Sequence, residues 1–413
     1  MTSVHAETVS GAHRLEFRSG FWVVAYVLLV VMAFATLPSP LYGLYRIQDH
    51  LSSLVITIVF AIFAAGTITA LLGVPRVAQR IGRRGVMLSA VAIMMVAAAL
   101  LAAWKGLPVL LIGRLLTGVA AGLAAGTAIT YLIELQLRAD PQSSMIRART
   151  IGTSITVGAL GVGPLVAGCL AEWAKWPLTL PYLVVLGLGA VGLVSLLFVP
   201  ETGTRTRPAR TSNQSTRPRS GGLPVPAAAG TIAAFAASGL FAGLAGLILT
   251  VTLGRPSHAL AGATLFLVFT CGVASQLATT RLRASSVLAL GTISMLVGLV
   301  FLVASVRLAS PNLALFLLGG AFIGAGLGAV FKGTTGIVLE AAAPENRLAL
   351  TSKLLVALYV GLSIPVIGAG IALDRGASIP NTVLGFAILV ALGVTVSGWA
   401  LLRRHHSPDI EDG

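Results

Sequence analysis

Twelve apolar stretches, each close to the length that crosses a lipid bilayer, dominate this 413-residue sequence. Hydrocarbon about 30 Å thick needs about 20 helical residues for one crossing. The stretches are expected at residues 21–37, 54–74, 86–104, 109–132, 151–171, 178–199, 227–253, 259–277, 287–306, 313–339, 354–373 and 382–402. The sequence therefore predicts an all-α polytopic membrane protein with twelve transmembrane helices.

The composition agrees with a chain that folds in lipid. Hydrophobic residues make up 56% of the chain and charged residues 10%, whereas soluble domains carry about 25% charged residues. A soluble core could not absorb so many apolar side chains without leaving large apolar patches exposed.

Positive charge is distributed unevenly between the two sides of the predicted membrane. Twenty of the 28 Lys and Arg residues lie in the termini or in loops on the same side, six lie on the opposite side, and two lie within spans. Cytoplasmic loops are enriched in Lys and Arg. Both termini and the middle loop are therefore expected in the cytoplasm, with the helices in a bacterial-type inner membrane. The net charge of +15 is then explained by the orientation of the helices in the membrane. No nucleic-acid partner is expected.

The segment 201–226 separates two sets of six spans. It holds five Arg among many Ser, Thr, Pro and Gly residues and almost no large apolar ones. Such a segment cannot bury enough surface to fold by itself, so it is expected to be a linker. The predicted organisation is a bundle over 1–200, a cytoplasmic linker over 201–226 and a second bundle over 227–413.

The two halves also share a pattern of residues. Two glycines and a glutamate at the fourth span recur at the tenth span at a constant offset of 206 residues, as Gly118, Gly122 and Glu134 against Gly324, Gly328 and Glu340. This pattern favours a duplicated six-helix unit. In transporters with such repeats, the substrate site lies between the repeats near the middle of the membrane.

Three motifs add to this pattern. The loop after the second span contains Arg80, Gly82, Arg83 and Arg84, with Gln79 before them. The fourth span reads Gly-Arg-xxx-Gly-xxx-Gly, with Arg114 followed by Gly118 and Gly122. The fifth span contains a Gly-Pro-xxx-Gly sequence at Gly163, Pro164 and Gly168.

Together these motifs resemble the major facilitator superfamily, and most of all its twelve-helix branch of drug/proton antiporters. The resemblance implies two pseudo-symmetric six-helix bundles that rock against each other. It also implies that glycines 118, 122, 163 and 168 serve close helix packing, as in the antiporter motif. Two positions depart from the family pattern: Gln79 stands where an aspartate is expected, and Pro75 stands where the leading glycine of the loop is expected.

The charged residues near the cytoplasmic ends of the spans are candidates for a gate. Arg83 or Arg84 is expected to pair with Glu134, with Arg80 and Gly82 shaping the same turn. In the second half, the matching pair joins Arg281 or Arg283 to Glu340. The alternative is that all of these are ordinary topology charges among lipid headgroups.

Two cations lie inside predicted spans and are the candidates for substrate binding or coupling. Arg114 lies in the outer half of the fourth span, where a cation is costly unless it faces water, an acid or carbonyl groups; alternatively its side chain reaches the outer interface. Lys332 lies near the inner end of the tenth span, where it either contacts substrate or only packs its stem.

Hydroxyl groups make up most of the remaining candidates. Thr117 and Tyr359 are expected to line a weakly polar cavity, together with Thr36, Ser39 and Tyr42. Hydroxyls in helices often bond their own backbone instead. Such a cavity with two cations suits amphipathic or weakly anionic small molecules.

Other chemistry is not expected. None of the thirteen acids lies in the middle of a predicted span, and the six histidines lack metal-ligand spacing. No phosphate-binding glycine loop with its Lys-Ser/Thr is present. We therefore expect no enzyme activity, no metal and no cofactor, with a proton gradient as the energy source.

The resulting expectation is a monomeric secondary transporter in the lipid bilayer that exports a small amphipathic or drug-like molecule by proton antiport. The alternatives are uptake of a polar nutrient, such as a sugar or an organic anion, and a non-transporting sensor built on the same bundle.

Overall fold

The computed structural model describes residues 11–202, 222–343 and 346–405, and within these ranges the regular elements are all helical. The first half holds α1 (Gly11–Thr36), α2 (Tyr42–Gln48), α3 (Ser53–Ala103), α4 (Leu107–Ala139), α5 (Met145–Trp173) and α6 (Leu180–Leu197). The second half holds α7 (Val225–Leu247), α8 (His258–Ala278), α9 (Ala284–Arg307), α10 (Leu313–Glu340), α11 (Arg347–Asp374) and α12 (Ile379–His405). Most of the predicted linker 201–226 lies outside the described residues.

The long helix α3 supplies two membrane crossings. It has 51 residues, about 77 Å at 1.5 Å per residue, which is far more than one bilayer needs. Its only non-helical backbone is at Gly82, with φ 80° and ψ 174°. Among the described residues, eleven helices are long and apolar enough to span a membrane. Because α3 folds back at Gly82, they provide the twelve predicted crossings.

The connection inside α3 differs from the predicted one. The apolar pattern ends near Val74, which suggests a loop from there to Val86, yet the backbone stays helical through Pro75 to Ile81. A helix can continue past the apolar stretch because its backbone hydrogen bonds do not depend on side-chain polarity. The turn is therefore confined to one glycine, and we call this side of the molecule the Gly82 end.

The first helix of each half breaks near the opposite end, which we call the Lys105 end. Pro38 has no N–H to donate, so α1 stops at Thr36 and a 3₁₀ turn over Ser39–Leu41 leads into α2. In the second half, α7 passes into a π-helical turn over Ile248–Thr252.

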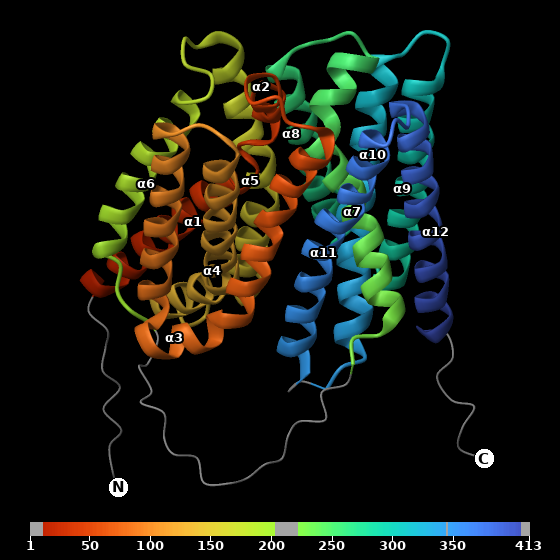
Figure 1. Cartoon of the computed structure of the whole chain (residues 1–413). Helices are drawn as coiled ribbons and strands as arrows, with labels where there is room; N and C mark the ends of the chain where they lie inside the picture. Colours follow the sequence, from red (N-terminus) through yellow and green to blue (C-terminus); the bar gives the residue numbers. More distant parts are fainter. Residues whose placement is uncertain (1–10, 203–221, 344–345, 406–413) are drawn as a thin grey trace, which may run out of the picture.

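The twelve crossings form two bundles that lie side by side in Figure 1. Within the halves, α3 packs on α4 and α9 packs on α10; between the halves, α5 packs on α8 and α3 packs on α11. The repeat is visible in the packing. Gly118 faces the backbone of Phe63, and Gly324 faces the backbone of Val268, so equivalent helices approach equally closely at equivalent positions.

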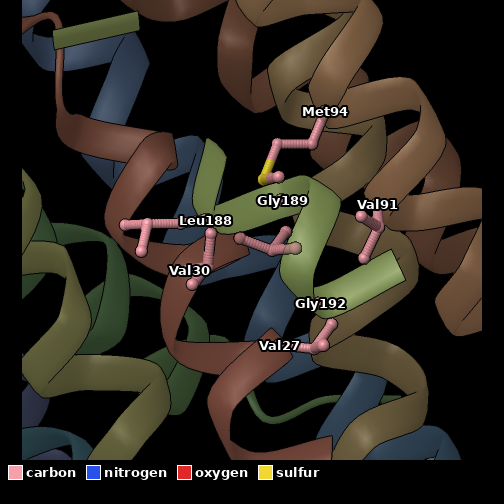
Figure 2. Close-up of a pocket in the computed structure, with 8 residues that line it drawn as sticks. Val27, Val30, Val91, Met94, Leu188, Gly189 and Gly192 are labelled. Atoms are coloured by element: carbon pink, nitrogen blue, oxygen red, sulfur yellow. The ribbon is translucent and has the colours of Figure 1, made fainter. Parts of the chain in front are cut away.

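The surface of the bundles suits a bilayer. All five tryptophans are largely exposed: Trp22 and Trp399 near the Gly82 end, and Trp104, Trp173 and Trp176 near the Lys105 end. Two such belts mark membrane interfaces. Figure 2 shows the niche where Gly189 and Gly192 of α6 meet Val27 of α1 and Met94 of α3. Its lining is entirely apolar, with no room for a water molecule, so it is helix packing and not a polar binding site.

Candidate functional site

Arg114 is the most deeply buried charge in the described part of the chain, with no exposed surface. It lies two turns into α4 from the Lys105 end. Its Nη1 donates to the carbonyl oxygen of Ala35 at 2.6 Å. Ala35 belongs to the last turn of α1, whose carbonyl groups lack intrahelical partners and carry the negative end of the helix dipole. One function of Arg114 is therefore to cap α1 where Pro38 ends it.

The cap uses only one of the guanidinium nitrogens. Nε and Nη2 of Arg114 are buried without a hydrogen-bond partner among the described residues, and so are the hydroxyls of Tyr42 and Ser39. Tyr42 and Tyr182 lie near the guanidinium. A buried polar group without a partner costs roughly 1–3 kcal/mol. The cluster therefore keeps hydrogen-bonding capacity that its own side chains do not use.

Aromatic rings enclose this cluster. The Arg114 Cζ lies 4.7 Å from the centroid of the Phe63 ring and 5.9 Å from that of Phe60. Tyr45 and Tyr182 share a hydrogen bond of 3.0 Å between their hydroxyls. The Phe63 ring packs edge-on against Tyr359, centroids 6.0 Å apart. Because Tyr359 belongs to α11, this stack joins Arg114 to the second half.

Two other predicted site residues, Thr117 and Lys332, donate hydrogen bonds to backbone carbonyls. Thr117 Oγ1 donates to the carbonyl of Gly113, one turn earlier in its own helix, at 2.7 Å. Lys332 Nζ donates to the carbonyl of Gln276 at 2.6 Å and lies 3.3 Å from Thr279 Oγ1. Because α8 ends at Ala278, Lys332 caps the C-terminus of α8. No described contact brings Lys332 to Arg114.

The Gly82 end carries a second polar cluster. The backbone N–H groups of Arg83 and Arg84 donate to the two carboxylate oxygens of Glu201, at 2.9 and 3.1 Å. A side chain at position 82 would collide with that carboxylate. The positive φ of Gly82 therefore serves two purposes: it turns the chain, and it lets Glu201 cap the first amides of the returning helix.

Glu134 completes this cluster. Arg83 Nη2 donates to Glu134 Oε1 at 3.3 Å, and Thr202 Oγ1 donates to Glu134 Oε2 at 2.6 Å. The Tyr131 hydroxyl donates to the carbonyl of Pro200 at 2.8 Å. The structure thus brings the expected partners Arg83 and Glu134 together. All of these contacts lie within the first half, so they brace one bundle and do not bridge the two.

The other expected gate residues are not brought together. Arg281, Arg283 and Glu340 are exposed, and no ion pair joins them within the described residues. The reason is local: α8 stops at Ala278 and the chain turns before Ala284, so no continuous helix folds back here as it does at Gly82. Arg80 is likewise exposed and apart from Glu134, while Arg84 donates to the carbonyl of Leu197.

At the Lys105 end, a carboxylate joins the halves. Glu172, near the end of α5, accepts hydrogen bonds from the backbone N–H groups of His258 at 2.7 Å and Ala259 at 3.4 Å. Nδ1 of His258 lies 3.5 Å from the same carboxylate. These amides belong to the first turn of α8, where free N–H groups and the helix dipole attract an anion.

A second carboxylate repeats this contact with the halves exchanged. Asp374, at the end of α11, accepts a hydrogen bond of 3.2 Å from the backbone N–H of Leu54 in the first turn of α3. The capping serines Ser52 and Ser257 precede the two helices at equivalent places. We call Glu172 and Asp374, with the helix starts they contact, the paired carboxylate clasps.

The glycine–proline motif of α5 lies at the same boundary. Gly163 faces the backbone of Ala33 in α1, whereas Gly168 faces the carbonyl of His258 in α8. The Pro164 carbonyl in turn faces Gly262 of α8. Two of the three motif residues therefore allow close contact between the halves. Gly118 and Gly122 serve close packing of α4 on α3 within the first half.

Lys105 lies outside the spans and closes the connection between α3 and α4. Its Nζ donates to the carbonyls of Leu101, Ala102 and Leu178 at 2.8–3.2 Å. Partial burial lowers the pKa of Lys105. Its three donors are all used, unlike those of Arg114.

Comparison with known proteins places this fold. The family model described as "Sugar (and other) transporter" matches residues 17–224, just over half of the chain. Multidrug resistance protein MdtL of Klebsiella pneumoniae (strain 342) is 29% identical over 187 residues, which cover 44% of this chain and 44% of that protein. The match therefore spans less than half of the length of MdtL.

Two solved structures share the architecture. A crystal structure of nucleoside transporter NupG has a TM-score of 0.67 at 11% identity and covers 96% of this chain and 100% of that one. That of a NupG mutant has a TM-score of 0.68 at 10% identity, with coverage of 95% and 99%. At such identities the likeness concerns the fold alone. With the family match, the twelve crossings and the duplicated halves, the chain belongs to the sugar (and other) transporter family of the major facilitator superfamily.

Proposed function

We propose that this transporter is a monomer that exports a small amphipathic molecule across the bacterial inner membrane, in exchange for protons, by opening its two halves at one end at a time. One observation carries the proposal. The hydrogen bonds that join Glu172 and Asp374 to the opposite half lie at the Lys105 end, in the paired carboxylate clasps. The polar cluster at the Gly82 end stays within the first half.

Orientation follows from the charges. Twenty of the 28 Lys and Arg residues lie on the side of the Gly82 end or in the termini, so by the positive-inside rule that end faces the cytoplasm. The clasps then close the outer side. The direction of transport is supported by the similarity to multidrug resistance protein MdtL and by the glycine–proline motif between α5 and α8.

The clasps supply acids on the outer side of the proposed transporter. The carboxylate oxygens of Glu172 and Asp374 accept hydrogen bonds from backbone amides of the opposite half, and helix N-termini attract such anions. Both acids therefore lie where the contact between the halves must break when the outer end opens.

The test is flux in proteoliposomes that contain the purified full chain. Ethidium, a cationic amphipathic probe, and 1-naphthoate, an anionic one, are followed with and without an imposed pH gradient. We expect a gradient of one pH unit to drive about tenfold accumulation of at least one probe, since one pH unit supplies about 1.4 kcal/mol for each proton exchanged. Flux of both probes that ignores the gradient would contradict antiport.

Uptake of a polar nutrient remains the second candidate, because the matching family is named for sugar transporters. The same vesicles separate the two. Counterflow of labelled glucose, with no effect of the gradient on either amphipathic probe, would support the nutrient function and replace the export proposal.

A further inference from the structure

The two nitrogens of Arg114 without a partner, Nε and Nη2, lie on the same edge of the guanidinium group. In a guanidinium group, the Nε–H bond and one N–H bond of Nη2 point the same way, in the fork that binds a carboxylate through both of its oxygens. These are the two nitrogens without a partner, whereas Nη1 caps Ala35. Capping of α1 therefore accounts for Nη1 only. It does not account for Nε and Nη2, the pair that binds both oxygens of a carboxylate.

No acidic side chain among the described residues pairs with Arg114, either in an ion pair or in a hydrogen bond. The partners that the described residues offer this cation are the carbonyl at the end of α1 and the rings of Phe60 and Phe63. A cation inside a membrane bundle normally pairs with an anion or faces water. The guanidinium is therefore a place where an anionic ligand gains a charged partner.

The surroundings of this edge indicate what kind of anion fits. The hydroxyls of Tyr42 and Ser39, three residues apart at the break after α1, are buried and have no partner. The rings of Phe60 and Phe63 lie beside the guanidinium. Hydroxyls can donate to an anionic oxygen, and aromatic rings favour an apolar body.

We infer that Arg114 binds the carboxylate of an amphipathic organic acid through Nε and Nη2, with the Tyr42 hydroxyl as a further donor. This inference rests on the proposed function and names the substrate class for the same bundle. Because Arg114 has no exposed surface, the acid reaches it only after the helices around it rearrange. The phenylalanine stack to Tyr359 of α11 then couples occupancy to the contact between the halves.

Equilibrium binding tests the inference without requiring transport. Titration calorimetry on the purified full chain compares 1-naphthoate with its neutral analogue 1-naphthamide, at low and at high chloride concentration. We expect the acid to bind about tenfold or more tightly than the amide, as one charge-assisted bidentate contact provides. Equal affinities, or no binding of naphthoate, would overturn the inference. Loss of naphthoate binding at high chloride, with full binding at low chloride, would overturn it in favour of an inorganic anion site.

Variants test whether Arg114 and Tyr42 cause the preference for the acid. Arg114→Gln is expected to remove the preference for the acid, and Arg114→Lys to weaken it, because lysine keeps the charge without the fork. Tyr42→Phe should lower naphthoate affinity about threefold and leave naphthamide unchanged. Lys105→Gln is the matched control, since Lys105 also caps a helix end but has no unused donor, and it should keep the preference.

A folding defect must be separated from a loss of binding. Monodisperse elution in size-exclusion chromatography shows which variants fold; if Arg114→Gln does not, Arg114→Lys and Tyr42→Phe decide. A preference for the acid that survives both of them would overturn the assignment. Gradient-driven flux of ethidium does not depend on a carboxylate, so it still tests the proposed function if the inference about Arg114 fails.

Discussion

At the scale of single residues, Gly82 shows how one backbone position sets the end of a bundle. Its φ of 80° lies in the left-handed region that other residues adopt at a cost, and a Cβ there would meet the carboxylate of Glu201. The amides of Arg83 and Arg84 are held by the same carboxylate. The turn and its cap therefore depend on the absence of one side chain.

Replacement of this glycine should be costly. Gly82→Ala is expected to destabilise the protein by about 1–3 kcal/mol, because the strained backbone and the displaced Glu201 act together. The measurement is the thermal unfolding midpoint of the purified protein in detergent. Gly73→Ala is the control, since a Cβ there meets nothing within 4 Å; an equal loss in both variants would contradict this explanation.

The contact of Glu201 with the start of the returning helix could not be predicted from the sequence. The Arg83–Glu134 pair could be expected because both ends of their helices fall on the same side of the membrane. Glu201 lies 118 residues from Arg83, and it reaches the amides of α3 only because α6 ends beside them. In the second half α12 ends at His405, and the acids that follow it, Asp409, Glu411 and Asp412, lie outside the described residues.

At the scale of helices, the paired carboxylate clasps hold the Lys105 end closed. Each exposed contact of this kind contributes about 0.5–1 kcal/mol. The two are related by the repeat, because Glu172 caps α8 and Asp374 caps α3. Helices of opposite halves are thus tied at their ends, in addition to the packing of α5 on α8 and of α3 on α11.

Removal of both clasps should open this end. In a variant with Glu172→Gln and Asp374→Asn, we expect the equilibrium to shift about fivefold toward opening, the equivalent of about 1 kcal/mol. The reporter is a cysteine at the buried position Thr57, which faces Gly370 of the other half, in a background without Cys169 and Cys271. Its labelling by a membrane-impermeant maleimide should become faster.

The control for that experiment is Asp140→Asn, an exposed acid at the Gly82 end that contacts only its own loop. It should leave labelling unchanged. If the clasp variant labelled no faster than this control, the clasps would have no part in closure.

Contact between α5 and α8 depends on small residues. Gly168→Val is expected to push the helices apart at the carbonyl of His258 and to cost about 1–3 kcal/mol as overpacking. The midpoint of thermal unfolding should fall, and the gradient-driven flux with it. Gly158→Ala is the matched control in the same helix, because its Cβ meets only Val273, at 3.8 Å. Unchanged flux in Gly168→Val would contradict the contact as a working interface.

The helices themselves were largely predictable. An apolar run near 20 residues must cross the bilayer because no other backbone satisfies its hydrogen bonds there, so span positions follow from hydropathy. The exception is the segment 74–86, where α3 remains helical beyond the end of its apolar stretch. Side-chain partners were less accessible: Thr117 bonds its own helix and Lys332 caps α8, and such choices depend on neighbours that lie far away in sequence.

At the scale of the whole molecule, the two bundles differ in how they are braced. The first half carries the Gly82 cluster and the Arg114 cluster, whereas the gate residues of the second half are separate. The halves meet through α5 with α8 and α3 with α11. We therefore expect the first half to move as a rigid unit relative to the second, with the clasps as the contacts that break.

Distances across the halves at both ends test this account most directly. Spin labels at Ile47 and Arg375 report on the Lys105 end, and labels at Gln142 and Arg283 report on the Gly82 end; all four residues are exposed. The distances are measured by double electron–electron resonance in nanodiscs, with and without 1-naphthoate at neutral and acidic pH. We predict two populations in which the first distance lengthens as the second shortens. Two distances that stay fixed, or that lengthen together, would contradict alternating access in this protein.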